Sequence, residues 1–139
     1  MHCPSSENPI VRLFNGHYKT EGINNDKPFL SESDFGAFPV QVRGHAHLYD
    51  SLESATFDPE MQQQTFFTRF PPILVLELSR FQYNQATQQA EKVHDRLNFD
   101  LLLYVDRYLE ENKAESCRRK IEVDQLRRKI KELDTRLDW

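Results

Sequence analysis

Short apolar runs separated by polar turn residues predict a first half built of strands and one helix. Alternation along residues 37–44 puts two valines, Val40 and Val42, on one face of a strand. Residues 47–57 carry apolar side chains at helical spacing, which predicts a short amphipathic helix. The other predicted elements are a strand at 10–14, a tight turn at Asn15-Gly16, a return strand at 17–23 and a loop at 24–28.

The most apolar stretch lies in the middle of the chain. Pro71 and Pro72 precede it, a position where a strand loses no hydrogen-bond donor that it needs. Residues 73–76 are apolar at every position, as in a strand that is covered on both faces. Residues 82–91 are polar and rich in Gln, and they predict a flexible connection. Strand-like spacing then resumes at Val93, Leu97 and Phe99.

The last third of the chain predicts one long, highly charged helix. Its apolar residues repeat at gaps of three and four, the pattern of a helix that packs against another helix. These seam residues are Val123, Leu126, Ile130, Leu133 and Leu137. Polar residues occupy the preceding seam positions, so only two heptads are intact, too few for a stable isolated coiled coil. We therefore expect this helix to form a homo-oligomer or to continue, because no capping residue precedes Trp139.

Charge divides the 139 residues into an acidic body and a mildly basic tail. Residues 1–106 carry eight Lys and Arg against 14 Asp and Glu, a net charge of −6, whereas residues 107–139 carry ten against eight, a net charge of +2. An acidic surface repels phosphate and argues against nucleic acid, but it suits a basic protein partner. No apolar run is long enough for a membrane span, and no signal-peptide core follows Met1. We expect a protein of the cytoplasm, the nucleus or both.

Candidate catalytic and metal-binding residues are few. Cys3 lies beside a proline near the N-terminus, and Cys117 lies in the charged helix, so we predict free thiols and no catalytic residue. His45 and His47 form one local pair without the further ligands that zinc requires, and a solvated loop explains them better. The four glycines are too dispersed for a phosphate loop. The sequence therefore predicts neither a metal site nor a cofactor.

Two aromatic residues, Phe81 and Tyr83, close the apolar stretch and precede the polar connection. Two interpretations of this pair are open from periodicity alone. Phe81 could belong to the core, or a sheet could present both side chains to an extended peptide at this point.

The region from Phe66 to Phe99 resembles the ubiquitin-specific proteases. In that family a segment of the form LPP-(I/V)-L-x-x-x-L-x-R-F is followed by an aromatic residue two positions on and by K-(I/V)-x-x-x-(L/F)-x-F-P. The matching residues are Pro71, Pro72, Leu74, Leu78, Arg80, Phe81, Tyr83, Lys92, Val93, Leu97 and Phe99. Asp100 replaces the final Pro. Within the family the chain is most similar to the members numbered twenty-five and twenty-eight, whose corresponding long helix opens an oligomerising insertion.

The resemblance implies a segment of the fingers and palm of a deubiquitinating catalytic domain. The family cleaves the isopeptide bond at the ubiquitin C-terminus with a Cys nucleophile, but its N-C-(Y/W) nucleophile motif is absent from this sequence. The paired CxxC motifs that hold zinc in many members are absent too. The resemblance makes Phe81 and Tyr83 candidates to contact the ubiquitin tail, and it makes ubiquitin and ubiquitinated proteins the expected partners.

These observations give one prediction of organisation and two of function. The fold class is α+β: a partial antiparallel fingers and palm sheet with a short helix, followed by a long C-terminal helix. Residues 1–105 form the fingers and palm segment, and residues 106–139 form the start of an insertion arm. The chain is predicted to be an inactive, ubiquitin-binding part of a ubiquitin carboxyl-terminal hydrolase. The alternative is a non-catalytic module that binds ubiquitin or interacts through its helix.

Overall fold

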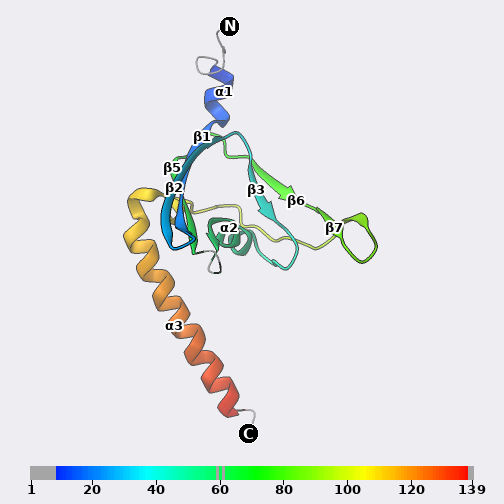
Figure 1. Cartoon of the computed structure of the whole chain (residues 1–139), viewed down its shortest axis with the longest axis vertical. Coiled ribbons are helices and arrows are strands. Elements are labelled where there is room, and N and C mark those ends of the chain that lie inside the picture. Colours follow the sequence, from blue (N-terminus) through cyan, green and yellow to red (C-terminus); the bar gives the residue numbers. More distant parts are fainter. Residues whose placement is uncertain (1–8, 59, 61, 138–139) are drawn as a thin grey trace.

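An antiparallel sheet of four strands lies at the centre of the computed structural model, with one short helix packed against it and a long helix leading away (Figure 1). The structure describes residues 9–58, 60 and 62–137. Its elements are α1 (Pro9–Phe14), β1 (Gly16–Asn24), β2 (Lys27–Phe35), β3 (Phe38–Gln41), α2 (Leu48–Thr56), β4 (Phe57–Asp58), β5 (Gln63–Arg69), β6 (Leu76–Ser79), β7 (Phe81–Asn84), β8 (Gln89–Lys92), two 3-10 turns, η2 (Asp106–Tyr108) and η3 (Glu110–Asn112), and α3 (Lys113–Leu137). The order in the main sheet is β2-β1-β5-β4. The predicted fold class is confirmed.

The hairpin of β1 and β2 turns at Asn25 and Asp26. Both residues have positive φ, 49° and 61°, the left-handed conformation that tight two-residue hairpin turns require. The return strand predicted at 17–23 is confirmed as β1, but the sequence predicted no strand where β2 lies. The side chains of β2 are mostly polar and exposed, so pairing with β1, not burial, makes this segment a strand.

The strand and tight turn predicted at residues 10–16 are wrong. Pro9–Phe14 is a short helix, since the fixed φ of Pro9 suits a first helical position and Asn15 donates its N–H to the carbonyl of Val11 (3.0 Å). Gly16 instead begins β1 at a point of close approach. A Cβ atom there would lie 2.4 Å from the ring of Phe35, so this position allows only glycine.

An aromatic cluster between the main sheet and β3 forms the core. Its buried members are Phe35, Phe38 and Phe67, whose ring centroids lie 4.9–5.7 Å apart in edge-to-face arrangements. The strand predicted at 37–44 is confirmed in part as β3, which ends at Gln41, and Val40 and Val42 are buried at 1% and 0% exposure. The predicted helix is confirmed as α2. It begins after His47, whose Nδ1 accepts the N–H of Tyr49, and it packs Leu52 into the core.

The central apolar stretch is only partly a strand. β6 begins at Leu76 and pairs in parallel with β3, so the strand predicted at 73–76 is placed too early. Ile73 and Val75 are 46% and 38% exposed. The two residues form backbone hydrogen bonds with different partners. The N–H of Ile73 donates to the carbonyl of Leu13, and the carbonyl of Val75 accepts from the N–H of Phe38. The strand-like spacing after Val93 also forms no strand, apart from one bridge between His47 and Asn98.

The 3-10 turns η2 and η3 connect the body to α3, which begins at Lys113. Tyr108 and Leu109 pack against the core cluster, and Leu109 forms an isolated bridge with Phe67 of β5. Lys19 of β1 forms an ion pair with Glu110 (3.3 Å), and this hydrogen-bonded contact raises the pKa of Lys19. The first residues after 105 therefore contact the body closely, and the boundary at 105/106 stays a prediction.

Replacing Tyr108 with phenylalanine should raise the free energy of unfolding by about 1 kcal/mol, because an unpaired buried hydroxyl carries a desolvation penalty. Tyr108 is 4% exposed, and among the described residues its hydroxyl has no hydrogen-bond partner. The same burial raises the pKa of its phenol, so the group stays neutral. Urea denaturation of the 139-residue chain measures the change. Tyr104→Phe, at a residue 62% exposed, should leave stability within about 0.5 kcal/mol. A loss of stability in Tyr108→Phe would show that the hydroxyl has a partner.

Candidate functional site

The predicted contact residues Phe81 and Tyr83 lie on an ordered hairpin formed by β7 and β8. The flexible connection predicted at 82–91 is therefore wrong, because two short strands pair along it. Phe81 and Tyr83 are two positions apart, so both point to the same face of the hairpin. They are 72% and 66% exposed, which excludes the interpretation that Phe81 belongs to the core. Figure 1 shows the hairpin extending from the body on the side away from the start of α3.

Polar contacts hold the turn of this hairpin. The side-chain oxygen of Asn84 accepts the N–H groups of Ala86 (2.9 Å) and Thr87 (3.4 Å), an Asx turn. Its amide nitrogen donates to Glu91 (2.8 Å), and Gln88 has a φ of 53°. The turn of the hairpin is therefore fixed without any burial.

Two arginines fix the base of the hairpin. Arg80 donates to the carbonyls of Val93 (3.3 Å) and Asp95 (2.9 Å), which ties the chain leaving β8 to the residue before β7. Arg43 donates to the side chain of Gln82 (2.8 Å) on the face opposite the aromatic pair. The hairpin thus holds two exposed aromatic side chains in a defined orientation.

The seam of α3 is a second exposed surface. Its residues are exposed as follows: Val123 43%, Leu126 60%, Ile130 58%, Leu133 50% and Leu137 82%. A long helix is confirmed, but α3 has 25 residues and begins at Lys113, since residues 106–112, predicted as part of the helix, contain two 3-10 turns. Arg118 and Arg119 both donate to Glu115, and these hydrogen bonds lower the pKa of its carboxyl to about 2. The role of the seam as an interface stays a prediction.

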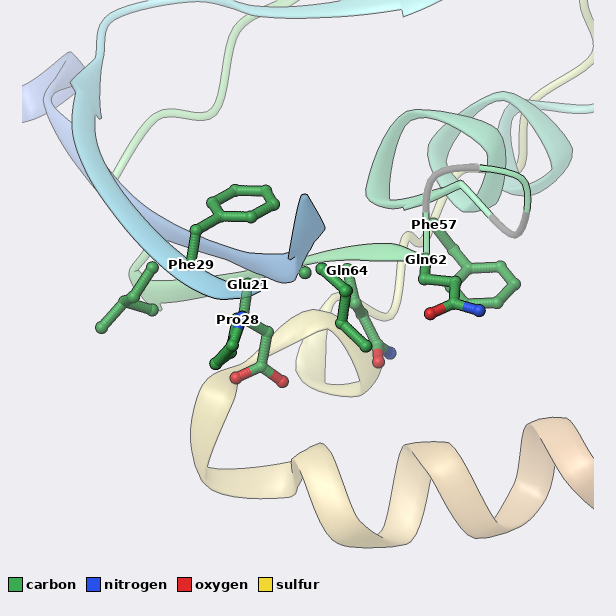
Figure 2. Close-up of a pocket in the computed structure, with 9 residues that line it drawn as sticks. Glu21, Pro28, Phe29, Phe57, Gln62 and Gln64 are labelled. Carbon is green, nitrogen blue, oxygen red and sulfur yellow. The ribbon is translucent and has the colours of Figure 1, made fainter. Parts of the chain in front are cut away.

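A concavity of about 670 Å³ lies at the tip of the β1–β2 hairpin, where the sequence predicts no site. Ile23, Leu30 and Phe57 supply apolar lining, and Gln62 and Gln64 supply amides. Figure 2 shows Glu21 and Gln64 pointing toward the first turns of α3, whereas Phe29 points to the other face of the sheet. The carboxylate of Glu21 pairs with Lys113, so the concavity offers mainly apolar and amide contacts.

The described part of the chain brings no nucleophile and base together. Cys117 is a free thiol whose Sγ contacts the side-chain oxygen of Gln64 (3.7 Å). His17 contacts Thr68 (2.5 Å), and His47 lies 3.5 Å from Asp100. Cys3 lies outside the described residues. Within residues 9–58, 60 and 62–137, no group of three or more His, Cys, Asp or Glu is arranged to hold a metal ion, and no helix has the length and apolarity of a membrane span.

Comparison with known proteins decides the family. The model of the family described as ubiquitin carboxyl-terminal hydrolase matches residues 1–122. The chain belongs to this family. Ubiquitin carboxyl-terminal hydrolase 28 of Homo sapiens is 39% identical over 145 aligned positions, covering 96% of this chain and 13% of that protein. The protein of the same name in Gallus gallus is 37% identical over 144 positions, with 96% and 14% covered. The chain thus spans 13–14% of the length of these two hydrolases.

Solved structures share the fold at lower sequence identity. The SAGA Ubp8/Sgf11/Sus1/Sgf73 DUB module bound to ubiquitin aldehyde aligns with a TM-score of 0.66 and 17% identity, covering 78% of this chain and 28% of that chain. The predicted resemblance to the ubiquitin-specific proteases, and to the member numbered twenty-eight, is confirmed. The family model and these relatives are both described as ubiquitin carboxyl-terminal hydrolases.

Proposed function

We propose that this chain is a ubiquitin-gripping segment of a thiol-dependent deubiquitinase and does not itself cleave the isopeptide bond. The observation that carries the proposal is the hydrogen-bonded β7–β8 hairpin, which exposes Phe81 and Tyr83 within a chain of this family. Aromatic side chains have few rotatable bonds and lose little conformational entropy on binding, and large aromatic residues are common binding hot spots. A fold neighbour of this chain is described as bound to ubiquitin aldehyde, which supports ubiquitin as the partner.

Charge supports the same partner class. The acidic residues 1–106, with a net charge of −6, suit a basic protein surface. Ubiquitinated proteins follow as partners if ubiquitin binds, and we propose the cytoplasm, the nucleus or both as the location. The thiol of Cys117 contacts the amide of Gln64, and the family's N-C-(Y/W) nucleophile motif does not occur in the sequence. Both observations support the proposal that residues outside this chain cleave the bond.

Phe81→Ala and Tyr83→Ala should each weaken ubiquitin binding at least about fivefold, since truncating an aromatic anchor typically costs about 1 kcal/mol or more. Titration of ¹⁵N-labelled ubiquitin with the 139-residue chain, followed by NMR, measures the affinity. The matched control is Phe99→Ala, because Phe99 is 71% exposed and lies outside the hairpin. The wild-type chain should release no fluorophore from a ubiquitin C-terminal amide.

Two results would contradict the proposal. One is equal affinity of wild type, Phe81→Ala and Tyr83→Ala, which would remove the hairpin from the ubiquitin contact. The other is turnover of the fluorogenic substrate that survives replacement of both Cys3 and Cys117, which would require a different catalytic group in this chain.

A second function, self-association through α3, is favoured by one observation. Five apolar seam residues in successive heptad positions are 43–82% exposed, a surface that a soluble helix normally covers. The occupant that we propose is the same seam of a second copy. This proposal does not depend on ubiquitin binding, and both surfaces can act in one protein.

A further inference from the structure

The first two turns of α3 dock against the body through one helical face. Residues 113, 116, 117 and 120 make up this face, which we call the root of α3. Lys113 pairs with Glu21 of β1, and its ammonium lies 5.2 Å from the centre of the Phe66 ring. At the other end of the root, Lys120 pairs with Glu53 of α2 (3.3 Å) and lies 4.9 Å from the centre of the Phe57 ring.

Two polar contacts lie between these lysines. Ser116 is 8% exposed and donates to the carbonyl of Arg107 (2.7 Å). The Sγ of Cys117 contacts Gln64 of β5 (3.7 Å). The root therefore carries no large apolar side chain. Its contacts with the sheet and α2 come from two lysines on acidic and aromatic groups and from the thiol of Cys117 on Gln64.

The character of α3 changes at Lys120. Residues 121–137, which we call the arm, are all exposed. The ion pair of Arg136 with Glu132 and the hydrogen bond from Thr135 to the carbonyl of Lys131 both join neighbouring turns of the helix. Figure 1 shows the arm leading away from the sheet. The apolar seam is also turned about 110° from the docked face of the root, at roughly 100° of rotation per residue. Docking of the root thus leaves the seam open to a partner.

We propose that the root is an electrostatic joint: Lys113 and Lys120 set the direction in which the arm leaves the body, and their release lets the intact helix swing about residues 110–112, while Tyr108 and Leu109 stay packed in the core. Lys113 and Lys120 are half-buried, and the side chains of their two ion pairs keep 27–43% of their surface exposed. Solvent weakens such ion pairs and salt screens them, and single cation–π contacts are also weak. Opening the joint also breaks the hydrogen bonds of Ser116 with Arg107 and of Cys117 with Gln64, but the core cluster contains no residue of α3, so the core stays folded. The arm and whatever its seam binds then change orientation relative to the β7–β8 hairpin.

Pulsed electron resonance between spin labels at Ser31 of β2 and Asp134 of the arm tests this joint. Both sites are exposed, and labels introduced as non-natural amino acids leave Cys117 in place. The samples contain the full 139-residue chain, diluted with unlabelled protein so that only distances within one molecule are read. Lys113→Gln/Lys120→Gln should widen the distance distribution at least twofold while circular dichroism at 222 nm stays unchanged.

Matched variants make the result specific. Lys129→Gln/Lys131→Gln removes the same charge from the arm and should leave the distribution narrow, and Lys113→Arg/Lys120→Arg should keep it narrow by preserving both cations. Raising NaCl from 0.05 to 1 M should widen the wild-type distribution. An unchanged distribution in Lys113→Gln/Lys120→Gln would overturn the proposal. Loss of helix content or of the body's melting transition in that variant would overturn it as well, since the root would then be part of the core.

Discussion

Phe67→Ala should destabilise the fold by about 3–5 kcal/mol, enough to unfold most of a marginally stable chain of this size. Phe67 is 2% exposed and lies in β5, an inner strand of the main sheet. Its ring packs against Phe38 of β3. Its ring centroid is 4.9 Å from that of Phe38, 5.4 Å from Phe35 and 4.6 Å from Phe70. Alanine would leave a cavity among these rings, and Phe35 and Phe38 are held in place by β2 and β3, so they cannot collapse into it.

Urea denaturation followed by fluorescence and circular dichroism measures this loss. The control is Phe99→Ala, which removes the same side chain where 71% of it is exposed and should change stability by less than about 0.5 kcal/mol. If Phe67→Ala unfolded at the same urea concentration as Phe99→Ala, the aromatic cluster would not be the core of the folded chain.

Elements whose cause is local were predictable from the sequence. The alternation around Val40 and Val42 and the helical spacing of α2 both place apolar residues on the face that is buried in the structure, so the signal lies within each segment. β2 has no such signal, because its side chains are mostly polar and exposed. Its cause is the turn at Asn25 and Asp26 together with nine pairs to β1, a contact outside the segment.

The central apolar stretch is the opposite case to β2, because its apolar composition predicted more burial than it has. Residues 73–76 are apolar at every position, which predicts burial on both faces, yet composition does not say which neighbouring strands cover a segment. Among the described residues only β3 pairs with β6, in parallel, and the carbonyl of Val75 accepts one backbone hydrogen bond from Phe38 of β3. Strand boundaries depend on such partners, so the sequence placed the strand three residues too early.

The candidate site was predictable in its residues but not in its form. The spacing of Phe81 and Tyr83 is compatible with a buried and with an exposed position. Their exposure follows from the pairing of β7 with β8, which forms a hairpin with both side chains on its open face. The polar segment after them looked like a flexible connection because it has no apolar face. The Asx turn at Asn84, with Glu91 as a second partner, orders it through hydrogen bonds instead.

Leu133→Asp should weaken self-association through α3 at least about 100-fold, from dimer to monomer at micromolar concentration. Leu133 occupies a d position of the seam and is 50% exposed in the single chain. In a paired seam its side chain would enter the facing helix, where an aspartate would lose hydration without a cationic partner, twice per dimer. Sedimentation velocity of the 139-residue chain across a concentration series measures the association constant.

Gln125→Asp is the matched control, because it adds the same residue and the same charge about 120° away from the seam, at roughly 100° per residue. It should sediment like the wild type. A wild-type chain that remains monomeric at 100 μM, a concentration chosen as about a hundredfold above micromolar affinity, would contradict pairing through the seam. So would equal loss of association in Gln125→Asp and Leu133→Asp, since helix destabilisation by aspartate, shared by both variants, would then explain the effect. Dimerisation lost only in Leu133→Asp would identify the apolar seam as the contact, because the two variants differ in position alone.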